Sequence, residues 1–255
     1  MSSPAAAWPP SGAVLGVDIG GSAIKAAVVD VDTGRLRAAR TEIATPRPST
    51  PDRVGAVLAD IASQVDWSGP IGVTFPAVIK RGIARSAANV DPSWLGADVD
   101  AILSAATGQD VTVLNDADAA GLAEVRFGAA RDVPGVVIVL TFGTGIGSAV
   151  FIDGALVPNT ELGHLELDGH DAESRAAASI KAREMLSYPD WAKRVNAYLS
   201  HVQALFSPDL FVLGGGISSD ADQWVPLLEL ATEVRPAQLH NDAGIVGAAM
   251  AVARP

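Results

Sequence analysis

The stretch DIGGSAIKAAVVD (Asp18–Asp30) decides the fold, because a similar stretch, TFGTGIGSAVFID (Thr141–Asp153), follows it 123 positions later. Each copy joins two apolar, strand-like runs through a glycine-rich turn. A gapless alignment matches three pairs of identical residues: Gly20 with Gly143, Ala26 with Ala149, and Asp30 with Asp153. The repeat predicts two similar domains, with a ligand cleft between them.

Val/Ile/Leu-rich runs alternate with Ala-rich amphipathic stretches, which predicts an α/β protein whose sheets are mixed rather than all parallel. Strands are expected at residues 13–20, 26–32, 71–76, 111–116, 135–143, 148–154 and 210–215. Helices are expected at residues 51–65, 98–108, 117–128, 191–206 and 242–253. We divide the chain into a loose tail (1–12), a first domain (13–117) and a second domain (118–255) whose final helix is a candidate to pack back on the first.

Composition limits the classes of protein to which the chain can belong. It has 255 residues, 49% hydrophobic, and no cysteine, which excludes disulfides, thiolate metal sites and cysteine nucleophiles. The net charge of −11 opposes general binding to nucleic acids or anionic membranes, so neither is expected as a partner. A secretory signal begins with a positively charged segment, and no Lys or Arg precedes Lys25 in this chain. A cytoplasmic protein is therefore expected.

The first glycine turn follows a predicted strand and could bind a phosphate. Gly20 and Gly21 let backbone N–H groups approach an anion, and the Ser22 hydroxyl adds a donor. Asp18 could hold Mg²⁺ through water, and Lys25 could add positive charge. The alternative is a plain hairpin whose glycines serve only the turn.

Two further turns repeat this pattern, and a matching pair makes the plain-hairpin interpretation weaker. The second contains Thr141, Gly143, Thr144 and Gly145, and it resembles a second phosphate cradle. The third contains Gly214, Gly215 and Gly216, which serve equally well as a tight turn between a strand and a helix.

A predicted strand ends at Asn115 and Asp116, and a predicted helix follows. A carboxylate at the end of a strand can point into a cleft and accept the proton of a hydroxyl that attacks phosphorus. Asn115 can bond a neighbouring hydroxyl, whereas Asp118 is a candidate cap of the helix. Without the other motifs, helix capping is the simpler role for these side chains.

The segment ELGHLELDGH (161–170) concentrates carboxylates and imidazoles in ten residues. Helical spacing could clamp a metal, but Gly163 and Gly169 argue against a helix, and zinc needs about four ligands. Carboxylates and neutral imidazoles also suit the hydroxyls of a sugar, which both donate and accept hydrogen bonds. A polar surface loop is the third interpretation.

Basic residues that could bind a polyanion are few in this acidic chain, and solvated surface charge is the simpler role for each. The candidates are Lys80, Arg81, Arg85, Lys181, Arg183, Lys193 and Arg194.

Together and in order, these motifs resemble the ROK family (repressors, open reading frames, sugar kinases) from about Leu15 to Ala251. The matching segments are GVDIGGSAIK, LNDADAAGLAE, LTFGTGIGSA, ELGH and FVLGGGIS. The resemblance implies two actin-like (ribonuclease H-like) domains with a cleft between them, Mg²⁺ as cofactor, and a homodimer.

The resemblance also implies residue roles. Asp116 would deprotonate the sugar 6-hydroxyl, and Asp18 would lie near the metal and the transferred phosphate. The sugar would be held by Asn89, Asn115, Glu161 and His164, with Glu173 as a further match.

One departure is informative, because the family's cysteine-rich zinc motif after GH is replaced here by LELDGHDAESRAAAS. No zinc site is therefore expected, and His164 is left to bind glucose. The branch without zinc implies inorganic polyphosphate as phosphoryl donor, alongside ATP. Lys80, Arg81, Lys181 and Arg183 are the proposed polyphosphate path.

Three alternatives remain at this point. A strictly ATP-dependent hexokinase for glucose or mannose would use the same residues. A sugar-sensing regulator would need a DNA-binding domain, and only about fourteen residues precede the first phosphate motif. An actin-like assembly protein would leave the sugar-type residues without a purpose.

Overall fold

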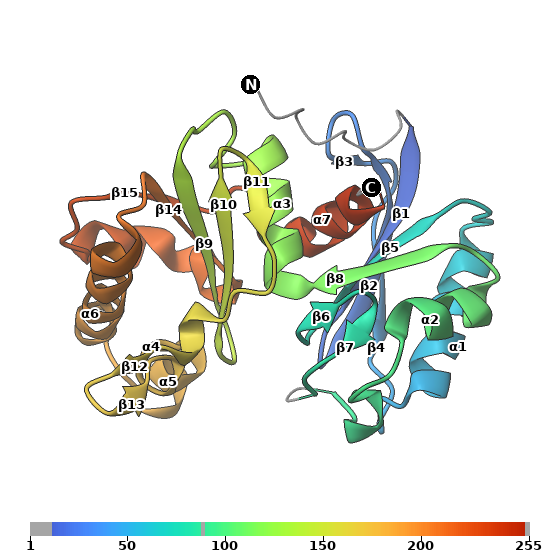
Figure 1. Ribbon diagram of the computed structural model, residues 1–255, viewed down its shortest axis with the longest axis horizontal. Coiled ribbons are helices and arrows are strands. Elements are labelled where there is room, and N and C mark those ends of the chain that lie inside the picture. Colours follow the sequence, from blue (N-terminus) through green and yellow to red (C-terminus); the bar gives the residue numbers. More distant parts are fainter. Residues whose placement is uncertain (1–11, 88–89, 253–255) are drawn as a thin grey trace. The chain divides into compact units, whose positions relative to one another are not determined.

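The computed structural model describes residues 12–87 and 90–252, which divide into two compact units (Figure 1). The first unit comprises the chain up to Ala123 and from Asp242 onward, and the second comprises Glu124–Asn241. The expected boundary after residue 117 falls inside helix α3 (Asp116–Phe127), which continues across the division. The final helix, α7 (Ala243–Ala251), belongs to the first unit. The predicted tail lies outside the described residues, apart from Gly12.

The first unit is built on a six-stranded sheet. Its strands are β1 (Ala13–Ile19), β2 (Ala23–Asp30), β3 (Arg35–Leu36), β4 (Thr41–Ala44), β5 (Ile71–Phe75) and β8 (Val111–Asn115). They are ordered β3-β2-β1-β5-β8, and β4 also pairs with β2. β1 and β2 form an antiparallel hairpin, whereas β1, β5 and β8 run parallel, so the sheet is mixed as expected.

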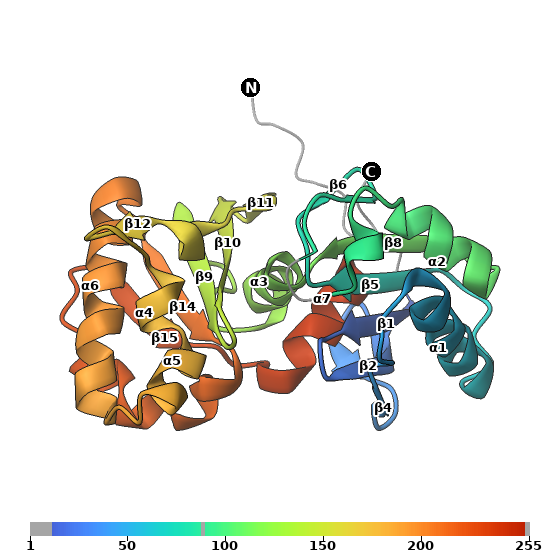
Figure 2. The same cartoon turned by 90° about the horizontal axis from the view of Figure 1, so that it is seen from below.

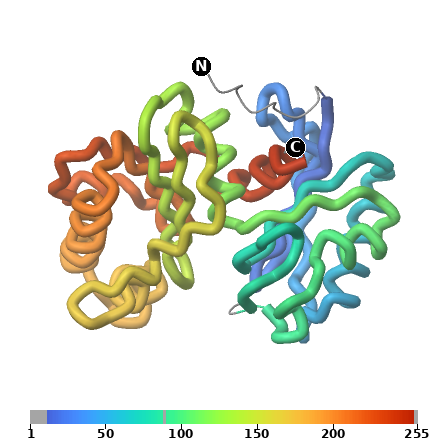
Figure 3. The backbone as a smooth tube through the Cα atoms, viewed as in Figure 1, coloured from blue at the N-terminus to red at the C-terminus, as the bar shows by residue number. Residues whose placement is uncertain are grey.

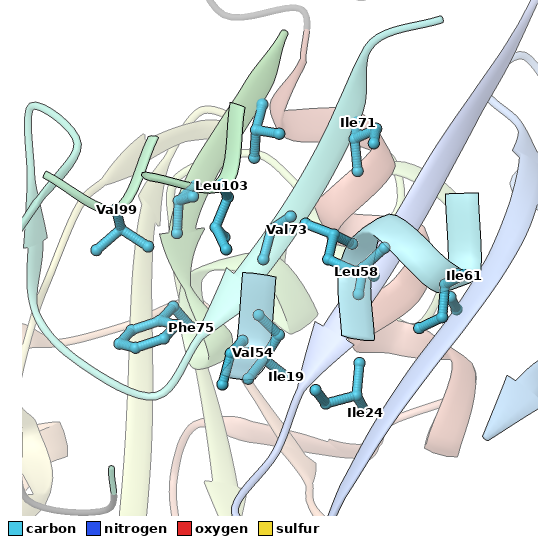
Figure 4. Packing of buried hydrophobic residues seen from close by; sticks show 14 of the residues in the cluster. Ile19, Ile24, Val54, Leu58, Ile61, Ile71, Val73, Phe75, Val99 and Leu103 are labelled. Atoms are coloured by element: carbon cyan, nitrogen blue, oxygen red, sulfur yellow. The ribbon is translucent and has the colours of Figure 1, made fainter. Parts of the chain in front are cut away.

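Helices α1 (Pro51–Gln64) and α2 (Val99–Thr107) pack on one face of this sheet (Figure 2). Proline in the first turn of α1 suits a helix start, and the Asp98 carboxylate caps α2 by accepting the Ala101 N–H at 3.0 Å. Figure 4 shows the core beneath α1, where the helical spacing of the apolar residues puts three side chains against the strands: Val54, Leu58 and Ile61.

The opposite face of the sheet receives α7, so that this late helix lies beside strand β1 (Figure 3). Gly16 of β1 and Gly72 of β5 are paired in register. A Cβ atom on Gly16 would run into the carbonyl oxygen of Ile245, and one on Gly72 into that of Ala248. The strands therefore need glycine at both positions to let the helix backbone approach.

The second unit carries a five-stranded sheet in the order β11-β10-β9-β14-β15. Its strands are β9 (Val136–Phe142), β10 (Ile146–Ile152), β11 (Ala155–Val157), β14 (Leu210–Gly214) and β15 (Glu233–Pro236). β9 and β10 are antiparallel, and β9, β14 and β15 are parallel, which repeats the pattern of the first sheet. The strands expected at residues 135–143 and 148–154 are thus present as β9 and β10, joined by a short turn.

The repeat is confirmed for the first strand of each unit, since β9 begins and ends 123 residues after β1. The second strands are offset by one residue, because the first turn joins the pair Ile19–Ile24 and the second joins Phe142–Ile146. Ala26 opposite Val17 therefore corresponds to Ser148 opposite Leu140, and not to Ala149 as the gapless alignment predicts. The shorter second turn is the physical reason.

Helix α6 (Tyr188–Phe206) contributes more buried residues to the core of the second unit than any other described element. The Ser187 hydroxyl caps its first turn by accepting the Asp190 N–H at 3.2 Å. Trp191 of α6 meets Phe142 and Trp224 edge-on, with ring centroids 5.8 and 4.9 Å away. Aromatic pairs of this geometry add roughly 0.5–1.5 kcal/mol to the effect of burial.

Short elements complete the chain. The first unit adds β6 (Ile79–Lys80), β7 (Ile83–Ala84) and η1 (Pro92–Trp94). The short helix η5 (His240–Asp242) crosses the division between the units. The second adds η2 (Leu162–His164), β12 (Glu166–Leu167), β13 (His170–Asp171), α4 (Glu173–Ala176), α5 (Ala178–Arg183), η3 (Gly216–Gln223) and η4 (Val225–Leu227). Over the described ranges, no helix has both the length and the apolar character to cross a bilayer.

A buried glutamate fixes the segment that leads out of the second unit. Glu124 of α3 is 1% exposed, and its Oε1 accepts the backbone N–H groups of Gln238 and Leu239 at 2.9 and 2.8 Å. Its Oε2 accepts the N–H of Ala129 at 2.8 Å. Three charge-assisted hydrogen bonds thus satisfy one buried carboxylate, and they join α3 to the chain that returns toward α7.

Replacing this carboxylate by an amide, Glu124→Gln, is expected to lower the free energy of unfolding by about 2–3 kcal/mol, because an NH₂ group would face a backbone N–H. Urea unfolding followed by circular dichroism measures the loss. Glu229→Gln, an exposed position of the same unit, is the matched control and should change stability by less than about 0.5 kcal/mol. Equal stability of the two variants would contradict the role of Glu124.

Candidate active site

The first glycine turn lies where β1 ends and β2 begins. The Gly20 N–H donates to the Ala23 carbonyl at 3.0 Å, and the Thr45 hydroxyl donates to the Gly20 carbonyl at 2.6 Å. The Thr45 N–H also donates to the Ser22 carbonyl at 3.0 Å. Gly21 and Ser22 are exposed on this braced turn, where their N–H and hydroxyl groups can meet an anion.

Asp18 leaves β1 on the face that carries α7. The Thr74 hydroxyl donates to Asp18 Oδ1 at 2.7 Å, and a Cβ on Gly244 in the first turn of α7 would lie 3.0 Å from the carboxylate carbon. The positive end of a helix favours a carboxylate in such a place. Lys25 lies opposite Asp18 in register, so the two side chains share one face of the hairpin. Thr74 lies in no sequence motif, so its contact with Asp18 becomes apparent only in the structure.

The end of β8 presents the predicted base. Asp116 is the first residue of α3 and is exposed, and its Oδ1 accepts the Ala117 N–H at 2.9 Å. Asn115 is half-buried and its amide N–H donates to the Ala77 carbonyl at 3.2 Å. Asn89, the other predicted sugar contact of this unit, lies outside the described residues.

The capping role predicted for Asp118 is wrong. Asn115 Oδ1 accepts the N–H groups of Ala117 and Asp118 at 2.9 and 3.1 Å, so that Asn115 caps α3. Asp118 lies within the helix and is 2% exposed. The physical reason is that the helix begins at Asp116, which places Asn115 at the capping position.

The second and third glycine turns lie side by side in the second unit, since Thr141 and Gly214 pair across β9 and β14. Gly215 has a φ of +85°, and a Cβ there would run into the backbone of Phe142. Gly145 lies against the carboxylate of Glu173, where a Cβ would collide with Oε2. Gly143 and Gly216 face no described atom within 4 Å. The structure thus gives two glycines a packing role and leaves two open toward a ligand.

The predicted phosphate residues Thr141 and Thr144 belong to the glycine turn between β9 and β10. Ser179 of α5 holds this turn by two hydrogen bonds. The Ser179 hydroxyl donates to the Thr144 carbonyl at 2.6 Å, and the Ser179 N–H donates to the Gly143 carbonyl at 3.0 Å.

The ELGH segment forms the short helix η2, followed by the hairpin of β12 and β13 rather than a longer helix. Gly163 packs against the Ile146 carbonyl, where no Cβ would fit. The Ser148 hydroxyl donates to the Thr160 carbonyl at 2.6 Å and accepts the Leu162 N–H at 2.9 Å. These contacts fasten the loop to β10, while its polar side chains at Glu161, His164 and residues 168–171 remain exposed, as a polar surface loop would also have them.

The structure brings Glu161, His164 and Glu173 together in the second unit. Glu173 Oε2 accepts the Ile146 N–H at 3.0 Å, and Glu173 Oε1 lies 3.9 Å from His164 Nδ1. Desolvation raises the pKa of the Glu161 carboxyl and Glu173 adds to this effect, while His164 opposes it. Acidic side chains that surround one imidazole suit a ligand rich in hydroxyl donors.

Asp171 is a functional candidate that no motif indicated. Its Oδ2 lies 2.9 Å from His164 Nδ1, and its Oδ1 accepts the Glu173 N–H at 3.2 Å. The hydrogen bond to Asp171 raises the pKa of the His164 imidazole, with further contributions from Glu173 and Glu161 and an opposing one from desolvation. Because Asp171 engages Nδ1, Nε2 is the nitrogen left for a ligand.

His164, Asp171 and Glu173 offer ligand atoms within 4.8 Å of one another, a spacing that could hold a metal ion. A structural zinc site needs four such ligands, and this group supplies three. The absence of a zinc site therefore stays a prediction.

The basic candidates fall into two local groups. Lys80 and Arg81 are exposed on the hairpin of β6 and β7 in the first unit, and no described carboxylate forms an ion pair with either. In the second unit, the Lys181 ammonium lies 3.9 Å from the centre of the Tyr188 ring, and Arg183 lies 3.6 Å from Glu184. The described contacts therefore leave Lys80 and Arg81 more available to an anion than Arg183.

Comparisons with known proteins agree with these motifs. The chain is 55% identical to a polyphosphate glucokinase of Mycobacterium tuberculosis over 238 residues, 93% of this chain and 90% of that protein. The solved inorganic polyphosphate/ATP-glucomannokinase of Arthrobacter sp. strain KM is 51% identical with a TM-score of 0.89, covering 94% of this chain and 98% of that one.

A ROK family glucokinase from Streptomyces griseus, solved with glucose and AMPPNP, is 26% identical with a TM-score of 0.80, covering 93% and 98%. The fold is the actin-like, two-domain fold of these sugar kinases, as expected. Residues 14–178 match the ROK family directly. The chain belongs to the ROK family.

Proposed function

We propose that the chain is a glucokinase that transfers a phosphoryl group from inorganic polyphosphate, and from ATP, to the 6-hydroxyl of glucose. The observation that carries this proposal is the 55% identity to a polyphosphate glucokinase over 93% of the chain. A second observation adds support. The chain has no cysteine for a zinc motif, yet it keeps the sugar-type side chains Glu161, His164 and Glu173 as one group.

Glucose would be held by hydrogen bonds from its hydroxyls to the acidic group of the second unit. Glu161 and Glu173 would accept hydrogen bonds from the sugar hydroxyls, and His164 would present Nε2 to the sugar. The Asp116 carboxylate, exposed at the start of α3, would accept the proton of the 6-hydroxyl as that oxygen attacks phosphorus. Asn115 would act by fixing the start of α3, because its amide is already engaged by the protein.

The phosphates of the donor would meet N–H groups of the glycine turns, at Gly21 and Ser22 and at Gly216, whereas the Gly143 N–H already donates to the Gly145 carbonyl at 3.0 Å. Mg²⁺ usually keeps several waters and takes one or two carboxylates plus substrate phosphates, and the half-buried Asp18 fits that need. When bound, the ion would neutralise charge on the phosphates. Lys25, on the same face as Asp18, would add positive charge.

Lys80 and Arg81 would extend the binding of a long polyanion beyond the site, with Lys181 and Arg183 as further members of the path. In a chain of net charge −11, exposed cations without a described ion-pair partner are where a polyphosphate would gain attraction. A homodimer and a cytoplasmic location complete the proposal, and the lack of cysteine fits a reducing compartment.

The test is formation of glucose 6-phosphate with Mg²⁺ when polyphosphate and ATP are offered separately, and with mannose in place of glucose in a parallel series. We expect product from both donors. The double variant Lys80→Ala/Arg81→Ala should raise the KM for polyphosphate several-fold, and less so at high salt, while the KM for ATP stays within twofold. Product from ATP alone would remove polyphosphate from the proposal, and no product from either donor would overturn it.

Asp116→Asn is expected to lower kcat by about 10²–10⁴-fold, because the amide cannot accept the hydroxyl proton. Glucose affinity, measured by isothermal titration calorimetry without donor, should remain within a few-fold. Asp110→Asn, an exposed carboxylate before the other end of β8, serves as the control with unchanged kcat. A kcat near that of the wild type in Asp116→Asn would exclude Asp116 as the base.

Asp171→Asn is expected to raise the KM for glucose by freeing the His164 ring, and to destabilise the protein in a pH-dependent manner. Because the folded pKa of His164 is raised, its contribution to stability is complete below the unfolded pKa of about 6.5 and is lost as pH rises through the folded pKa. The loss of unfolding free energy should therefore be larger at pH 6 than at pH 9, and below about 1 kcal/mol because both side chains are exposed.

Chemical denaturation at the two pH values measures this difference. Asp168→Asn is the matched control, since Asp168 is exposed in the same hairpin and asparagine tolerates its φ of +53°. A loss in Asp171→Asn that is the same at pH 6 and pH 9 would show that Asp171 does not act through the charge of His164.

A further inference from the structure

The hydroxyl of Tyr198 is buried without a hydrogen-bond partner among the described residues. Tyr198 lies in α6 and is 1% exposed, and its hydroxyl oxygen is one of the few buried polar atoms in this situation. Buried Tyr hydroxyls usually find a partner. The group therefore requires an explanation beyond packing.

The phenol of Tyr198 packs in the core of the second unit, on which helix α4 with Glu173 also packs. The Tyr198 ring meets Phe142 edge-on, with centroids 6.5 Å apart. Phe142 is paired with Ile146 across β9 and β10, and the Ile146 N–H donates to Glu173 Oε2. The helix that carries Glu173 also packs on α6, since the Trp191 indole N–H donates to the Ala176 carbonyl at 3.0 Å. The ring contact of Tyr198 with Phe142 and the contact of α6 with α4 thus put Tyr198 and the segment that carries Glu173 in one core.

Electrostatics agree with this placement. Burial raises the pKa of the Tyr198 hydroxyl, and the negative charge of Glu173 raises it further. The hydroxyl is therefore held protonated, as a hydrogen-bond donor, and its pKa responds to the charge of that carboxylate.

A phenylalanine would fill the same space in the aromatic core without the cost of a buried unpaired hydroxyl. Such a group is normally destabilising. The hydroxyl thus has a structural cost and, by itself, no structural benefit, which favours a role at the neighbouring site.

We propose that Tyr198 is a positioning residue for Glu173: its hydroxyl, through one bridging water, holds the carboxylate in the orientation that accepts a glucose hydroxyl. The role rests on the proposed glucokinase function. Glu173 then has three supports, from the Ile146 N–H, from His164 and from Tyr198. A buried water between two polar groups is a common way to satisfy both.

The test compares the wild type with Tyr198→Phe in glucose kinetics, donor-free glucose binding and thermal stability. We expect the KM for glucose to rise about tenfold, as for a lost hydrogen bond to a charged group, with kcat within twofold and Tm equal or higher. Tyr188→Phe, on the same helix, is the matched control: its hydroxyl donates to Asp220 at 2.6 Å, so it should lower Tm and leave the KM for glucose unchanged.

A double-mutant cycle separates positioning from packing. In a Glu173→Gln background, Tyr198→Phe should no longer change the affinity for glucose, because the group through which it acts is gone. The same fold-change in both backgrounds would overturn the inference, since it would place the effect elsewhere in the core.

The remaining outcomes are also decisive. An active wild type with an unchanged KM in Tyr198→Phe overturns the role of Tyr198 and leaves the glucokinase proposal intact. A wild type that neither phosphorylates nor binds glucose overturns the proposed function and this inference with it.

Discussion

The close approach of α7 to β1 and β5 is the constraint on which the first unit depends. Gly16 and Gly72 remove the two side chains that would separate helix from sheet, and Gly247 of α7 packs in the same way on the backbone of α3 at Ala119. The last helix of the chain is thus fixed on both sides by backbone contacts that no larger residue allows. Because α7 follows the whole second unit in sequence, the first unit is complete only when the chain has returned. The same packing puts the first turn of α7 beside Asp18, so the expected metal-side carboxylate depends on residues from both ends of the chain.

Helix α3 combines functions that are usually separate. Its start is set by Asn115, which caps it and leaves Asp116 exposed as the first helical residue. Its middle crosses the division between the units, and Glu124, just after that division, holds the segment that leads back to α7 through the N–H groups of Gln238 and Leu239. The position of the proposed base is therefore linked, through one helix, to the buried carboxylate that fixes the returning chain. A change at Glu124 would act on the fold, whereas a change at Asp116 would act on the chemistry, although the two residues are only eight positions apart in one helix.

Local patterns predicted the strands and helices well, because apolar periodicity and glycine turns act over a few residues. The repeat correctly indicated two equivalent hairpins, but it could not show that the second turn is one residue shorter, since a gapless alignment hides such an offset. Contacts between distant segments were not predictable. Nothing local marks Glu124 as the acceptor for residues 238 and 239, or Asp171 as the partner of His164. The glycines show the limit most clearly: the sequence left open whether each turn cradles phosphate or only turns the chain, while the structure packs Gly145 against the side chain of Glu173 and Gly215 against the backbone of Phe142.

The chain has no cysteine, and the structure shows which side chain orients the imidazole of His164. A histidine that binds a sugar through one ring nitrogen can rotate unless the other nitrogen is held. A rotating ring is a poor acceptor for a sugar hydroxyl. In this chain the carboxylate of Asp171 has this role, at 2.9 Å from Nδ1, on a short hairpin whose turn residues, Asp168 and Gly169, both have positive φ. Asp171 also accepts the N–H of Glu173, so a single aspartate fixes the imidazole and the start of the helix that carries the neighbouring carboxylate. In the proposed sugar site, this hydrogen-bonded hairpin would order the imidazole, and the acidic groups around it would offer acceptors to a ligand with several hydroxyl donors.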